Sequence, residues 1–137
     1  MKTITLFLCI FFATSCEKDD DKLTEQDNYE IAATWNLMTT VPGCFSPVYS
    51  YTDEIQWTFN TNNTVDVVIE SGTEMSHELH INLGGNYMYN IDNGLITLTN
   101  NDIEVSYYYE LLSNELILST PPGGCGESTV ITFNMSE

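Results

Sequence analysis

The chain has 137 residues, with twenty acidic residues against three lysines and no arginine, and a formal net charge of −17. All three lysines lie before Leu23, so a nucleic-acid-binding surface, which needs clustered cations, is excluded. A hydrophobic content of 42% with 12% aromatic residues excludes a disordered acidic tail, and the length suits one small domain.

The first residues have the pattern of an export signal. Lys2 precedes an apolar run over residues 4–13, which at about ten residues is too short to span a bilayer as a helix. Small residues then stand directly before Cys16, which resembles the lipobox of bacterial lipoproteins, with Ala13 where leucine is usual. The resemblance implies a signal peptide over residues 1–15 and a lipid on Cys16 that anchors the chain to a membrane. A plain secretory signal with an unmodified cysteine is the alternative.

The segment after Cys16 is acidic and lacks aromatic residues. It cannot bury enough surface to offset the entropy lost on ordering, so residues 16–28 are predicted to form a flexible tether. An acidic run with a lysine at this place resembles the surface-export signals of some Gram-negative lipoproteins, and a plain solvated spacer is the alternative. Glu17, rather than aspartate, follows the cysteine, so the inner-membrane retention signal of enteric bacteria is absent. The expected location is the outer membrane, with display at the cell surface.

From residue 29 to residue 137, apolar residues alternate with polar ones in short runs separated by Asn, Gly, Asp and Pro. This period of two predicts an almost entirely β domain. A polar turn over residues 60–63 separates the second and third strands. The shared faces of the first three strands are predicted to be Trp35, Leu37 and Val41; Ile55, Trp57 and Phe59; and Val65, Val67 and Ile69.

The second half of the domain repeats this pattern. Asn93-Gly94 lies between two alternating runs and predicts a tight hairpin turn, because both of its residues tolerate a positive φ. The expected faces are Tyr87, Tyr89 and Ile91; Ile96 and Leu98; Val105, Tyr107, Tyr109 and Leu111; Leu116 and Leu118; and Ile131, Phe133 and Met135. Eight strands joined mostly by tight turns favour an antiparallel up-and-down barrel, which leaves no exposed edge. An immunoglobulin-like sandwich is the alternative, but its crossings need longer connections.

Four segments of this domain resemble the small lipocalin-like domains of bacterial lipoproteins. The segments are ATWNL from Ala33 to Leu37, EIQWTFN at residues 54–60, GNYMYNI at residues 85–91 and YYYELLSNELIL at residues 107–118. Larger lipocalins usually have glycine where Ala33 stands, two residues before the tryptophan. The resemblance implies an eight-stranded lipocalin-like barrel that can bind a small apolar ligand, although no ligand is established for most small members.

The cysteines fit an exported protein. The first leaves with the signal peptide and Cys16 is lipidated, so Cys44 and Cys125 are the pair left in the mature domain. Both lie in Gly/Pro-rich loops that open at one rim of a barrel whose first and last strands are neighbours. We expect a disulfide that stabilises the fold by about 4 to 5 kcal/mol in the chain-entropy model, with two free thiols as the alternative. Two cysteines are too few for a metal site, and His77 and His80 are expected at the surface.

No motif of catalysis is present: the chain has no glycine-rich phosphate loop, no HExxH and no GxSxG. The fourteen acidic residues from Glu30 onward leave a glycosidase-like carboxylate pair open without indicating one. We therefore expect neither an enzyme nor a cofactor.

A ligand inside the barrel would be a neutral or cationic apolar molecule. The domain has no lysine or arginine to bind a carboxylate head group, and an unpaired anion buried among acids would cost several kcal/mol. Aromatic side chains would bind such a ligand through stacking or cation–π contacts, and they are equally able to fill a narrow barrel. The candidates are Trp35, Trp57, Tyr87, Tyr89, Tyr107 and Tyr109.

The sequence thus leaves two functions open. The first is a small-ligand carrier at the cell surface, which requires an internal apolar cavity. The second is a tethered interaction or accessory module, which requires a filled barrel and an exposed patch, with Met88 and Tyr108 as candidate surface residues.

Overall fold

The computed structural model describes residues 30–44, 47–77, 79–123 and 125–137. The expected signal peptide over residues 1–15, the lipidated Cys16 and the tether over residues 16–28 lie outside the described residues. The described strands are β1 (Thr34–Val41), β2 (Tyr49–Ser50), β3 (Ile55–Phe59), β4 (Thr64–Ile69), β5 (Gly85–Asp92), β6 (Leu95–Asn100), β7 (Ile103–Leu112), β8 (Glu115–Ser119) and β9 (Val130–Met135).

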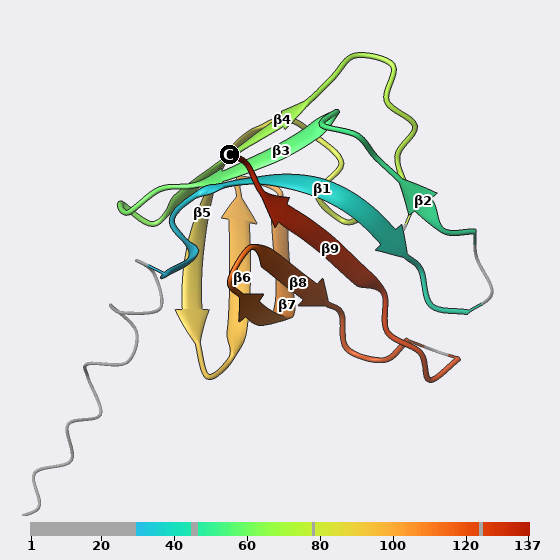
Figure 1. Ribbon diagram of the computed structural model, residues 1–137. Coiled ribbons are helices and arrows are strands. Elements are labelled where there is room, and N and C mark those ends of the chain that lie inside the picture. Colours follow the sequence, from blue (N-terminus) through green and yellow to red (C-terminus); the bar gives the residue numbers. More distant parts are fainter. Residues whose placement is uncertain (1–29, 45–46, 78, 124) are drawn as a thin grey trace, which may run out of the picture.

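Strands β1 and β3 to β9 close into one antiparallel barrel (Figure 1). Each strand pairs with the next along the chain, and β9 returns to pair with β1 from Trp35↔Met135 to Val41↔Val130. Strand β2 is an addition to this ring, because it pairs with the end of β1 alone. The predicted eight-stranded up-and-down barrel is confirmed, and the structure adds a short ninth strand.

The barrel has two unlike ends. We call one of them the turn end. It has the tight turns at residues 60–63, 93–94 and 113–114. The two ends of the described chain, residues 30–33 and 136–137, also lie there. The loop end is opposite and comprises the connections at residues 42–54, 70–84 and 120–129, with the short turn at residues 101–102. The long connections lie to the right in Figure 1.

The turns of the turn end follow from their sequence. Asn93 and Gly94 have φ values of 50° and 76°, as the predicted tight hairpin turn requires. Asn63 also has a positive φ of 64°, and the turn before β4 is closed by a 2.8 Å hydrogen bond from the Asn60 N–H to the Thr64 carbonyl. Asparagine tolerates this left-handed conformation better than most residues.

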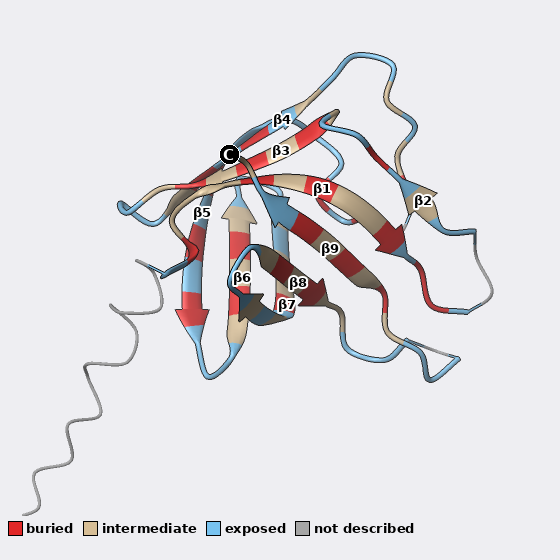
Figure 2. Cartoon of the chain, in the orientation of Figure 1, coloured by how far each residue is buried: buried red, intermediate tan, exposed pale blue. Residues whose placement is uncertain are grey.

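Inward side chains from every strand of the ring make one hydrophobic core. Figure 2 shows buried bands along the strands, whereas most of the connecting loops are exposed. The largest fully buried side chains include those of Trp35, Trp57, Tyr87, Tyr107, Phe59 and Phe133. Their alternation with exposed residues confirms that the period of two in the sequence marks strands with one buried face.

Each end of the barrel is covered by apolar side chains from outside the strands. At the turn end Ile31 is fully buried, and its carbonyl accepts a 2.9 Å hydrogen bond from Nε1 of Trp35. At the loop end Leu79 and Ile81, from the β4–β5 connection, are 1% and 0% exposed. His80 is exposed between these two buried residues, and His77 is exposed as well, so both histidines lie at the surface as predicted.

One predicted inward residue points outward. The pairing of β1 with β9 shifts register between Leu37 and Thr39. Such a bulge reverses the alternation of side chains beyond it, so Thr40 is fully buried and Val41 is 42% exposed. The prediction that Val41 shares a buried face with Trp35 is therefore wrong. Met135, at the end of β9, is also exposed.

Candidate functional site

The six aromatic residues predicted to bind a ligand belong to one core. Five of them are buried, and Tyr109 is half-buried and packs against the others. The five are Trp35, Trp57, Tyr87, Tyr89 and Tyr107. The barrel thus brings together side chains from β1, β3, β5 and β7.

Two of these rings, those of Trp57 and Tyr89, contact phenylalanine rings of the core. The ring centroids of Trp57 and Phe133 are 5.0 Å apart, and those of Phe59 and Tyr89 are 5.2 Å apart in an edge-to-face arrangement. Contacts of this kind add about 0.5 to 1.5 kcal/mol per pair beyond the burial of area. The aromatic residues therefore stabilise the barrel by packing on each other.

Two tyrosine hydroxyls of the core bind the backbone at its borders. The hydroxyl of Tyr87 donates to the Leu83 carbonyl at 2.8 Å, and the hydroxyl of Tyr89 donates to the Asn60 carbonyl at 2.9 Å. Burial raises the pKa of Tyr87 and of Tyr89. Both phenols therefore stay neutral near pH 7 and act as hydrogen-bond donors that fix connecting segments.

Four other buried polar atoms have no hydrogen-bond partner among the described residues. One is Oδ1 of Asn36, and the other three, on fully buried side chains, are Oγ1 of Thr40, Nε1 of Trp57 and the hydroxyl of Tyr107. Burial also raises the pKa of Tyr107. An unsatisfied buried polar group costs about 1 to 3 kcal/mol, so these atoms would gain from a small hydrogen-bonding molecule such as water.

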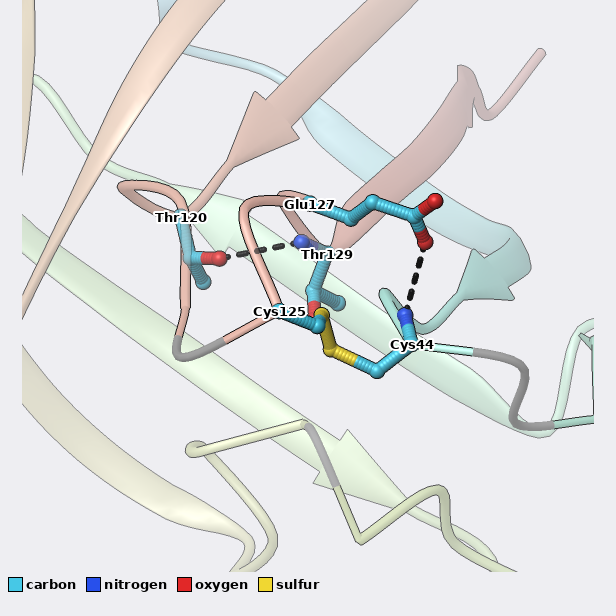
Figure 3. Close-up of a disulfide and its surroundings, with 5 residues drawn as sticks. All are labelled: Cys44, Thr120, Cys125, Glu127 and Thr129. Atoms are coloured by element: carbon cyan, nitrogen blue, oxygen red, sulfur yellow. Dashed lines mark hydrogen bonds between the residues drawn. A yellow bond between two sulfur atoms is a disulfide. The ribbon is translucent and has the colours of Figure 1, made fainter.

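A disulfide joins two connections at the loop end (Figure 3). Cys44 and Cys125 are bonded, with their Cα atoms 5.8 Å apart, although 81 positions separate them in the sequence. The backbone N–H of Cys44 also donates to Oε2 of Glu127 at 2.8 Å. The predicted disulfide is thus confirmed, and it fixes the segment after β1 against the segment before β9.

Close backbone contact accompanies this disulfide. A Cβ atom at Gly43 would lie 2.9 Å from the Glu127 carbonyl oxygen, so the approach requires glycine. A small pocket of about 300 Å³ lies here, with lining residues that include His80, Thr120 and Thr129. The centroid of the His80 ring lies 6.4 Å from that of the Tyr107 ring.

A larger groove lies at the same end, between β2 and the start of the β4–β5 connection. Its volume is about 640 Å³, and its walls are residues 47–51 on one side and residues 70–74 on the other. Three carboxylates line it, those of Glu54, Glu70 and Glu74. The groove therefore combines a strand edge with a concentration of negative charge.

This groove was not predicted from the sequence. Val48 and Ser50 alternate with Tyr49 and Tyr51, which is the pattern of a strand. The strand itself, β2, has only two residues, too few for this alternation to predict it. The approach of Glu54 to Glu70 follows from the hairpin of β3 and β4 around the turn at residues 60–63, whereas the position of residues 47–51 beside them had no sequence signal.

The two exposed residues proposed for a surface patch are far apart. Met88 is 63% exposed on β5 and Tyr108 is 51% exposed on β7. Strand β6 lies between β5 and β7, and its Thr99 pairs with Met88 on one side and with Glu104 on the other. Tyr108 lies four residues further along β7 than Glu104. The structure does not join these side chains into one apolar patch.

In the described part of the chain, no three histidine, cysteine or carboxylate side chains come together as metal ligands do. None of the helical segments described is long and apolar enough to cross a bilayer.

Comparisons of the chain with protein-family models, with curated protein sequences and with solved structures found no match.

Proposed function

We propose that this protein is a lipid-anchored module that binds another molecule through the loop end of its barrel and carries no small-molecule cargo. The observation that supports this most is the packed interior. The aromatic side chains that would bind a cargo are buried or half-buried in one hydrophobic core, and two described pockets, of about 640 and 630 Å³, lie at the rims of the barrel. The lipocalin-like barrel serves here as a rigid support for its rim.

The position of the chain ends supports the same orientation. The described chain begins at Glu30 beside the turn end, and the long connections gather at the opposite end. A lipid on Cys16 would hold the turn end toward the outer membrane through the tether at residues 16–28, with the loop end facing away from it. Contact with a partner at the cell surface would then involve the long connections first.

One observation favours the alternative, a small-ligand binder. The buried polar atoms of Thr40, Trp57 and Tyr107 lack partners in the described structure. A small neutral molecule with hydrogen-bonding groups would satisfy them, and ordered water would do the same.

Native mass spectrometry of the protein purified from its own cells tests both functions. We expect the mass of the mature chain from Cys16 with its lipid and no additional bound species. A co-purifying small molecule that is lost on unfolding would contradict the proposed function and support the binder. A chain that begins elsewhere, or lacks the lipid, would contradict the anchoring.

A further inference from the structure

We propose that the groove between β2 and residues 70–74 binds an extended peptide segment rich in lysine or arginine, which pairs with the free edge of β2 as an added strand. This inference rests on the proposed function. It names the binding surface of the module and the chemistry of its partner.

The first support is the unpaired edge of β2. One edge of this strand pairs with β1, as Thr39↔Ser50 and Thr40↔Tyr49, and the N–H of Tyr51 continues the pairing to the Met38 carbonyl at 2.9 Å. Successive residues of a strand direct their backbone groups to opposite edges. The N–H and carbonyl of Ser50 therefore face away from β1, where a further strand would pair.

The second support is that both walls of the groove are held in place. The hydroxyl of Tyr51, a residue only 6% exposed, accepts a 3.2 Å hydrogen bond from the Ser76 N–H and so links β2 to the β4–β5 connection. The N–H of Glu70 donates to the Glu54 carbonyl at 2.8 Å and extends the pairing of β3 with β4. A groove formed before binding loses less entropy when a partner enters it.

The third support is charge. The groove carries the carboxylates of Glu54, Glu70 and Glu74, and residues 23–137 contain no lysine or arginine to pair with them. A partner with cationic side chains supplies the missing counter-charges, whereas an acidic segment is repelled. Complementary charge also raises the rate of encounter at low salt.

The side chains that line the groove are complementary to a peptide with a cationic residue at every second position. Such a peptide, when extended, directs its cationic side chains to one face and the others to the opposite face. The ring of Tyr49 is half-buried at the groove and offers a surface for a cation–π contact. Val48, 58% exposed beside it, offers an apolar contact to the other face.

Peptide binding to the full-length protein in detergent micelles tests this inference. The probe is a capped pentapeptide of alternating lysine and valine, with its affinity measured by isothermal titration calorimetry. We expect binding that weakens as sodium chloride is added, because salt screens the charges. The same peptide with glutamate in place of lysine should not bind.

Two protein variants examine the charge and the strand edge separately. The triple variant Glu54→Gln, Glu70→Gln and Glu74→Gln should bind at least about tenfold more weakly, whereas the matched variant Glu104→Gln, Glu110→Gln and Glu115→Gln should bind as wild type does. Ser50→Pro removes the N–H at the free edge without touching the pairing with β1, and should also lower the affinity by about tenfold.

A modified probe keeps the test valid if Ser50→Pro does not fold. The pentapeptide with alternate backbone nitrogens methylated keeps its charge but cannot pair as a strand, so it should lose binding to the wild-type protein. Equal binding of the methylated peptide, or of spermidine, would overturn the inference by showing that charge alone is recognised. Absence of peptide binding would overturn it too, while leaving the mass-spectrometric test of the proposed function unaffected.

Discussion

The turn end and the loop end of this barrel are built by different means. At the turn end the connections have at most four residues, and residues that accept a positive φ, such as Asn63, Asn93 and Gly94, define their geometry. At the loop end three connections have ten or more residues, and contacts between distant segments hold them. Those contacts are the Cys44–Cys125 disulfide, the Tyr51–Ser76 hydrogen bond and the burial of Leu79.

The two ends differ in their capacity to carry a binding surface. The residues of a tight hairpin turn are restricted to those that accept its backbone dihedral angles, and the turn is too short to form a binding surface. A long connection fixed by a few distant contacts can carry exposed polar and charged groups at no cost to the barrel. The groove with Glu54, Glu70 and Glu74 lies at the loop end for this reason.

Removal of the disulfide should have the largest effect on the loop end. Cys44→Ser together with Cys125→Ser should lower the free energy of unfolding by about 4 to 5 kcal/mol in the chain-entropy model, because the unfolded chain is no longer closed into a loop. Urea unfolding followed by tryptophan fluorescence measures this. The wild-type protein in reducing agent should match the double variant. A loss below about 1 kcal/mol would show that other contacts hold this end.

Truncation of the apolar cover at the loop end should have the next largest effect. Leu79→Ala removes a side chain that is 1% exposed and should cost about 3 kcal/mol of unfolding free energy. Leu83→Ala makes the same chemical change in the same connection at a residue 62% exposed, and should cost less than about 0.5 kcal/mol. Similar losses in the two variants would mean that Leu79 does not anchor the β4–β5 connection.

A pair of glycine substitutions compares the two ends directly. Gly94 at the turn end and Gly72 at the loop end have φ values of 76° and 92°, and a Cβ atom at either would meet nothing within 4 Å. Gly94→Ala should cost about 1 kcal/mol, because the hairpin holds this residue in the left-handed region. Gly72→Ala should cost less than half of that, since Gly72 lies between the two anchored positions Glu70 and Ser76, and its backbone can adjust there without moving either. Equal costs in thermal unfolding would contradict the greater freedom of the loop end.

The smallest expected effect concerns Asp66, on β4 between the two ends. Hydrogen bonds from the side chains of Asn86 and Asn60 lower the pKa of Asp66 from its ordinary value of 3.8. The folded protein therefore binds this proton more weakly than the unfolded chain does. The stability from these contacts is present above about pH 4 and is lost as the pH falls through the folded pKa.

Unfolding measured from about pH 5 down to about pH 2 tests this sign. In Asp66→Asn the loss of stability with acid should be smaller than in wild type, whereas Asp102→Asn, which has no such pair of amide donors, serves as the control for removal of a carboxylate. An unchanged acid dependence in Asp66→Asn would contradict the prediction.

Much of the barrel could be predicted because its signals are local. Alternation of apolar and polar residues identified β1 and the strands from β3 to β9, and Asn93-Gly94 identified its turn. The pairing of Cys44 with Cys125 followed from the neighbourhood of the first and last strands. These features depend on the period of a strand, the φ preference of a turn residue and the closure of a barrel.

The errors and omissions come from features without a local signal. The outward direction of Val41 results from a bulge against β9, a strand about ninety residues further along the chain. Strand β2 is two residues long and exists because β1 extends beyond the part that pairs with β3. The direction of the Val41 side chain and the existence of β2 therefore depend on which strands pair, and not on the strand propensity of the residues themselves.

An all-β barrel, most of its core and the Cys44–Cys125 disulfide could be predicted from the sequence, because burial and turn preferences are properties of individual residues. Only the folded chain shows which aromatic rings are in contact and that residues 54, 70 and 74 line one groove beside a free strand edge. Those arrangements depend on which strands become neighbours, and that is a property of the closed sheet as a whole.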